Sequence, residues 1–99
     1  MPIRHRPKPK RGRPRGAASF HAPSAVAFGT VVREARLEAG ISQEALAYMA
    51  NVERSYLGRI ERGLSQPTLY LIFKVAAALA YDAATLIDFV QKTMVETDE

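Results

Sequence analysis

The stretch SQEALAYMANVERSYLGRIER, residues 42–62, consists of two short amphipathic segments separated by a tight break. Ser42 is a good N-cap for the first segment, and Glu44 puts a negative charge in its positively polarised first turn. The inner face of this segment would be Leu46, Ala47 and Ala50. Asn51 follows, a residue type that tolerates left-handed backbone angles. The pattern predicts a helix, a tight turn and a second helix over about residues 53–62.

Helical periodicity continues on both sides of this stretch. Upstream, we expect a helix from Ser24, as its cap, to Gly40, as its left-handed stop, with an apolar stripe of Phe28, Val32 and Ala35. Downstream, Gly63 ends the helix at 53–62, a fourth helix opens at Pro67 and runs to about residue 80, and a fifth covers about residues 83–94. The sequence therefore predicts an all-α domain of five helices at residues 24–94, followed by an acidic tail at 95–99.

Charge is divided sharply along the 99 residues. Residues 1–16 contain seven Lys/Arg and no Asp/Glu, whereas residues 17–99 contain seven Lys/Arg and ten Asp/Glu, a net charge of −3. Residues 1–23 are also rich in proline and lack helical or strand periodicity, so we expect a disordered basic arm. Such arms often contact nucleic acid, and the alternative is a solubilising terminus.

Several classes of protein are disfavoured by what the chain lacks. There is no cysteine, the two histidines (His5 and His21) lie in the arm or its junction, and no carboxylates cluster, so we expect no enzyme, metal or cofactor. No apolar run reaches 18 residues, and no apolar segment of signal-peptide length follows the basic start. We therefore expect a cytoplasmic protein, and a basic arm that contacts nucleic acid would associate it with the nucleoid.

The layout of residues 42–62 is that of a DNA-binding helix-turn-helix. Small residues, Ala47 and Ala50, stand where the two helices would touch. The second helix has apolar anchors for its inner face: Val52, Leu57 and Ile60. Its outer face has groups that can contact DNA: Arg54, Ser55, Tyr56, Arg59 and Arg62. A solvated charged face is the alternative interpretation of these arginines.

About residues 25–90 resemble the lambda-repressor-like, XRE-type helix-turn-helix family. The residues that carry the resemblance are Ser42-Gln43-Glu44, Leu46-Ala47, Ile60-Glu61-Arg62-Gly63, Pro67, and Ala76 with Ala78-Leu79. The resemblance implies a five-helix DNA-binding domain whose third helix enters the major groove. The sequence departs from the family in two places, with Asn51 at the usual turn glycine and Glu53 at the usual Ser/Thr cap. Glu53 could accept from a cytosine or repel phosphate.

Roles for individual residues follow from this resemblance. Base contacts are implied for Arg54, Ser55 and Arg59, and phosphate contacts for Gln43, Arg62 and Thr68. Tyr56 would either contact phosphate or pack on the preceding helix. Arg36 and Glu61 would form a structural ion pair between the first and third helices.

The fourth helix, TLYLIFKVAAALA, is apolar nearly all round. One stripe, Leu69, Ile72, Ala76 and Leu79, is expected in the core. A second stripe and the apolar residues of the fifth helix predict an interface with a second copy or another protein, formed by Tyr70, Phe73, Ala77, Ile87, Phe89 and Val90. The alternative is that the fifth helix covers both stripes. A homodimer would predict a pseudo-palindromic operator in double-stranded DNA.

The arm contains KRGRPRG, residues 10–16, which resembles an AT-hook. Pro14 keeps the segment extended, so that Arg11, Arg13 and Arg15 could lie in the narrow minor groove of A·T-rich DNA. The sequence thus predicts a sequence-specific transcriptional regulator, with repression as the favoured mode. In size it resembles restriction-modification controller proteins and phage Cro-like repressors. An antitoxin and a weakly specific architectural DNA-binding protein are the two rival interpretations.

Overall fold

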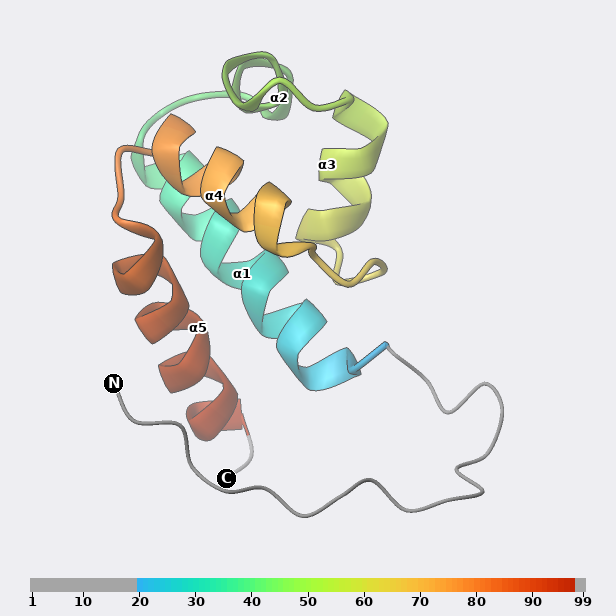
Figure 1. The fold of residues 1–99 in the computed structure, drawn as a ribbon, viewed down its shortest axis with the longest axis vertical. Coiled ribbons are helices and arrows are strands. Elements are labelled where there is room, and N and C mark those ends of the chain that lie inside the picture. Colours follow the sequence, from blue (N-terminus) through green and yellow to red (C-terminus); the bar gives the residue numbers. More distant parts are fainter. Residues whose placement is uncertain (1–19, 98–99) are drawn as a thin grey trace.

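The computed structural model describes residues 20–97, and these residues form five helices and no strand. The helices are α1 (Ala22–Glu38), α2 (Gln43–Ala50), α3 (Arg54–Glu61), α4 (Leu69–Ala78) and α5 (Ala83–Thr97). In Figure 1, α1 crosses the centre of the domain, with α5 along one side and the α2–α3 pair at the other end. The all-α, five-helix prediction is confirmed for this part of the chain.

The helix ends are set by residues that satisfy free backbone groups. Ser42 caps α2 by accepting from the Ala45 N–H at 3.0 Å, and Thr68 caps α4 by accepting from the Leu71 N–H at 3.0 Å. Gly40 and Gly63 have φ of +75° and +73°, as expected for residues that follow a helix. Asn51 closes α2 in the left-handed region, with φ 57° and ψ 50°, so the predicted turn is present.

Three boundaries differ from the prediction. The cap of α1 is His21, whose ring accepts from the Ser24 N–H, so the helix begins two residues before Ser24. Helix α5 continues through residues 95–97, which were expected to belong to the acidic tail. Helix α4 begins at Leu69 because the Thr68 hydroxyl caps it there, so Pro67 precedes the helix.

A single core joins all five helices. Its most buried large side chains are Phe28, Val32, Leu46, Leu57, Ile60, Val75 and Leu86. Helix α4 contributes Leu71, Val75, Ala76 and Leu79 to this core, whereas Leu69 is 67% exposed. The prediction that Leu69 belongs to the buried stripe was therefore wrong, and Leu71 takes that place. No single helix among residues 20–97 is long and apolar enough to span a membrane. Helices α4 and α5 reach the required length and apolar composition only when taken together, and the chain bends by 107° between them.

Gly29 in α1 allows an unusually close approach to α3. A Cβ atom there would lie 2.7 Å from the carbonyl oxygen of Glu61 and closer still to that of Ile60. These are backbone atoms at the end of α3, so they cannot turn aside as a side chain could. Gly29 was not among the residues predicted to shape the fold, although a glycine within a helical pattern is a signal of close packing.

Gly29→Ala is expected to destabilise the domain by roughly 1–3 kcal/mol, because the added methyl group forces α1 and α3 apart. The measurement is urea unfolding followed by circular dichroism. Ala27→Gly is a matched control in the same helix, where the loss of helix propensity and of a buried methyl group involves no overlap. A Gly29→Ala protein as stable as the parent would contradict the close contact.

Candidate nucleic-acid interface

The helix-turn-helix formed by α2 and α3 rests on a buried apolar seam. Helices α2 and α3 contact each other, and Ala47 and Ala50 of α2 are buried in the same apolar core as Leu57 and Ile60 of α3. The N–H of Val52 donates to the Ala47 carbonyl at 2.9 Å across the left-handed Asn51. The small side chains let the helices pack closely, and the turn sets the direction in which α3 leaves α2.

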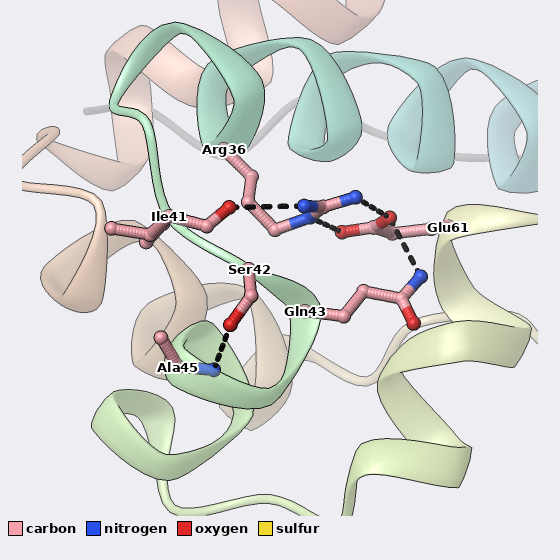
Figure 2. Close-up of polar contacts among 6 residues, drawn as sticks. All are labelled: Arg36, Ile41, Ser42, Gln43, Ala45 and Glu61. Carbon is pink, nitrogen blue, oxygen red and sulfur yellow. Dashed lines mark hydrogen bonds and ion pairs between the residues drawn. The ribbon is translucent and has the colours of Figure 1, made fainter.

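A buried ion pair fixes α3 relative to α1 (Figure 2). Arg36 donates from Nε to Glu61 Oε2 at 2.7 Å and from Nη2 to Glu61 Oε1 at 3.0 Å, a two-pronged contact. The third nitrogen, Nη1, donates to the Ile41 carbonyl at 3.0 Å, in the link before α2. The hydrogen bonds to Glu61 raise the pKa of Arg36 above its ordinary value, so the guanidinium stays charged. The side chains are only 10% and 1% exposed, which makes the pair part of the interior.

Gln43 joins this network from the first turn of α2. Its amide Nε2 donates to Glu61 Oε1 at 2.9 Å, so the carboxylate accepts three hydrogen bonds from two helices (Figure 2). One of the two N–H groups of the amide is used in this way, and the other remains available as a donor. Gln43 thus orients α3 and can still donate outward from the N-terminus of α2.

The exposed face of α3 has three arginines. Arg54, Ser55 and Arg59 are exposed, and so is Arg62, the residue that ends the helix. The Arg62 guanidinium lies close to Gly58: its Nη1 is 3.4 Å from the position that a Cβ atom on Gly58 would occupy. Glu53 precedes α3 without a side-chain capping bond, and Glu61 is turned inward, so the exposed face between them is positive. A positive, exposed helix face held by a rigid network can meet a polyanion.

Two further predicted contacts have other partners within the fold. Tyr56 is half-buried and packs against the core, which favours the packing role left open by the sequence. Thr68 uses its hydroxyl oxygen as the cap of α4, and its hydroxyl proton is still free to be donated. Arg11, Arg13, Pro14 and Arg15 lie outside the residues that the structure describes.

Residues 32–86, which include the whole α2–turn–α3 unit, match the helix-turn-helix family. The chain belongs to this family. Among helix-turn-helix relatives, the control protein C.BamHI of Bacillus amyloliquefaciens is 40% identical over 63 residues, covering 63% of this chain and 78% of that protein. The chain is similar in structure to the restriction-modification controller protein C.AhdI of Aeromonas hydrophila, with TM-score 0.61 and 42% identity over 63% and 94% of the two chains.

A third helix-turn-helix relative has been solved together with DNA. The restriction-modification controller protein C.Esp1396I was crystallised as a tetramer in complex with its natural 35 base-pair operator. This chain superimposes on it with TM-score 0.68 and 26% identity, covering 73% of this chain and 95% of that one. The resemblance to the XRE-type family is confirmed by these matches.

The predicted interface of this helix-turn-helix domain is divided among several surfaces. Phe73 and Ile87 line one groove between α4 and α5, together with the exposed Leu69. Tyr70 and Ala77 border a different groove, beside α2, and Tyr70 lies under the Lys74 ammonium, 4.5 Å from its ring centroid. Phe89 faces α1 and contacts Tyr81 edge to face at 5.8 Å. Val90 is buried in the core, so its assignment to the interface was wrong.

Proposed function

We propose that this chain is a sequence-specific DNA-binding transcriptional regulator that inserts α3 into the major groove, with repression as the favoured mode. The observation that carries the proposal is the exposed Arg54, Ser55 and Arg59 face on a helix held by the buried Arg36–Glu61–Gln43 network. Arginine can donate two hydrogen bonds to guanine, which identifies that base in the major groove. The rigid network supports such readout because a base-reading helix has to keep its register on the duplex.

Phosphate contacts at the edges of the groove would hold α3 in register. Gln43 can donate its second amide N–H, assisted by the positive N-terminus of α2. Arg62 and Thr68 stand at the other end, after α3 and before α4, with a guanidinium and a hydroxyl proton to donate. These groups would position the protein without reading sequence.

Selection of binding sites from random duplexes tests the proposal. We expect one enriched sequence, bound at physiological salt at least 10³-fold more tightly than random DNA, the lower end of the usual range for specific binders. An architectural protein would enrich no sequence, and its affinity would fall equally for all duplexes as salt rises. A reporter gene with the selected site beside its promoter would then show whether binding represses transcription.

We further propose a two-fold homodimer formed through the groove between α4 and α5. Its apolar lining includes Leu69, Phe73 and Ile87, which are 67%, 52% and 40% exposed. Apolar surface of this extent usually marks an interface, and a two-fold axis buries the same patch on both copies. Such a dimer would present two α3 helices about 34 Å apart, one turn of DNA, to a pseudo-palindromic operator.

Phe73→Glu combined with Ile87→Glu is expected to give a folded monomer, because two carboxylates per copy would have to be buried at the two-fold axis. Sedimentation at micromolar concentration is the measurement, with circular dichroism to confirm folding. Val95→Glu is the matched control, since Val95 is exposed on α5 but lies outside this groove. A parent protein that sediments as a strict monomer, with and without DNA, would contradict the dimer.

The basic arm is proposed to contact the minor groove beside the major groove that α3 occupies. Its point of attachment supports this, because the start of α1 is bonded to the link that follows α3. His21 N–H donates to Gln66 Oε1 at 2.6 Å, and Gln66 Nε2 donates to Ser24 Oγ at 2.9 Å. Arg15 and Ala22 are joined by seven Cα–Cα steps, which can extend over about 23 Å.

Arg13→Ala combined with Arg15→Ala is expected to weaken binding most on operators flanked by A·T runs, whose narrow minor groove attracts inserted arginine. The measurement is the dissociation constant on two duplexes with the same core site and either A·T or G·C flanks. Lys8→Ala with Lys10→Ala removes the same charge outside the Arg-Pro-Arg segment and serves as control. An equal loss of affinity on both duplexes would show that the arm makes only a general electrostatic contact.

A further inference from the structure

A groove of about 360 Å³ lies between α1 and α5, on a surface formed without residues of α2 or α3. Its lining includes Val31, Glu34, Glu38, Tyr81, Phe89 and Glu96. The edge-to-face contact of Tyr81 with Phe89 places two aromatic rings along it, and Val31 adds aliphatic surface. The groove therefore combines an apolar, aromatic floor with ionisable side chains.

The charge of this groove is net negative, because three glutamates and one lysine line it. The ion pairs within residues 20–97 are Arg36 with Glu61 and Lys92 with Asp88, so Glu34, Glu38 and Glu96 have no cationic partner in this part of the chain. Lys92 also lines the groove, but its ammonium lies 3.0 Å from the Asp88 carboxylate, which offsets its charge. Glu34 and Glu38 stand four residues apart on α1, where like charges destabilise a helix. A cationic occupant would relieve this repulsion.

We propose that the occupant is the chain's own basic arm, residues 8–15, KPKRGRPR. This segment has five Lys/Arg and no acidic residue, which complements the three glutamates of the groove. Two prolines favour an extended backbone, and extended proline-containing segments dock in grooves lined by aromatic side chains. Arginine also stacks on aromatic faces, so Phe89 and Tyr81 suit it as well as the glutamates do.

The arm is long enough to reach. From Ala22, where α1 begins, to Glu34 is a rise of about 18 Å along the helix. Residues 8–15 lie 7 to 14 Cα–Cα steps from Ala22, which span up to about 23 to 46 Å when extended. The same copy can therefore fill its own groove, and the surface proposed for the dimer, around Phe73 and Ile87, is left free.

If the arm docks in the groove, the groove and DNA compete for the arm. An arm held by Glu34 and Glu38 is not available to the minor groove, so DNA must displace it. This consequence rests on the proposed DNA binding, whereas the docking itself does not. The groove would reduce binding to random DNA, and a site with a favourable minor groove would still recruit the arm.

Chemical-shift comparison tests the docking without DNA. The backbone amide spectrum of the full chain is compared with that of an Arg11→Gln, Arg13→Gln, Arg15→Gln variant at low salt. We expect differences concentrated at residues 31–38 and 89–96, which vanish in about 1 M NaCl, where the screening length falls to about 3 Å. Differences confined to α3, or absent from α1 and α5, would overturn the proposal. Differences that appear only at high protein concentration would also overturn it, because they would assign the groove to the arm of a second copy.

A mutant cycle tests the competition. Glu34→Gln with Glu38→Gln is expected to tighten binding to random duplexes about threefold to tenfold, as for an arm that is docked most of the time. The same two substitutions in the arm-neutralised variant should change affinity far less, because that variant has no docked arm to release. Long-range charge effects act equally in both backgrounds and therefore cancel in the comparison. Equal tightening in both backgrounds would overturn the competition. If docking shifts are seen but neither protein binds DNA, the proposed function fails and the docking stands.

Discussion

Glu61→Leu is expected to lower the free energy of unfolding by about 3–5 kcal/mol, the usual cost of leaving one member of a buried ion pair without its partner. The Arg36 guanidinium would keep its charge in a site that is 10% exposed, with only the Ile41 carbonyl left to accept from it. Gln43 would lose its acceptor at the same time. Urea unfolding followed by circular dichroism at neutral pH measures the loss, and a cost below about 1 kcal/mol would contradict the burial of the pair.

Two controls separate the buried charge from the contact itself. Arg36→Met with Glu61→Leu removes both charges and should recover much of the lost stability, because apolar residues of similar volume often replace buried pairs without penalty. Asp88→Ala with Lys92→Ala breaks an exposed pair at four-residue spacing, 3.0 Å long, and should cost no more than about 0.5 kcal/mol beyond the effect of the substitutions on helix propensity. The double apolar variant should nevertheless bind DNA less well, since α3 would lose three hydrogen bonds that orient it.

The helix ends and the turn could be predicted because local chemistry determines them. Ser42 was recognisable as a cap since its hydroxyl satisfies a free N–H of the first turn, and the structure has that bond. Asn51 was recognisable as a left-handed residue since few other side chains tolerate those angles. In α2 and α3 a narrow apolar stripe points one way, so the buried faces were also predicted.

In helix α4 the apolar pattern of the sequence does not identify which face is buried. It is apolar on nearly every side, so periodicity alone could not decide between Leu69 and Leu71 for the core. The partition of Phe73, Tyr70 and Phe89 among three grooves depends on how α4 and α5 are rotated against their neighbours. That rotation is a property of tertiary packing, which no local pattern contains.

Arg54→Ala combined with Arg59→Ala is expected to abolish sequence-specific binding. Each arginine that makes a two-pronged guanine contact contributes roughly 1–3 kcal/mol of discrimination, so the loss is about tenfold to a hundredfold for each. Both side chains are exposed and take no part in the network around Glu61, so the fold should be unchanged. Competition of the selected operator against a scrambled duplex at fixed salt is the measurement, because the ratio of the two affinities cancels the general electrostatic attraction.

The loss of positive charge by itself has to be excluded as the cause of the lost specificity. Arg33→Ala with Lys74→Ala removes two positive charges from α1 and α4, neither of them among the predicted base contacts, and should lower both affinities slightly while leaving their ratio intact. Arg59→Lys keeps the charge but loses the planar fork, so it should retain binding to scrambled DNA and lose preference at one base pair. If the double alanine variant still prefers its operator to the scrambled duplex by the parent ratio, α3 does not read sequence through these arginines. Recognition would then have to come from the shape of the DNA.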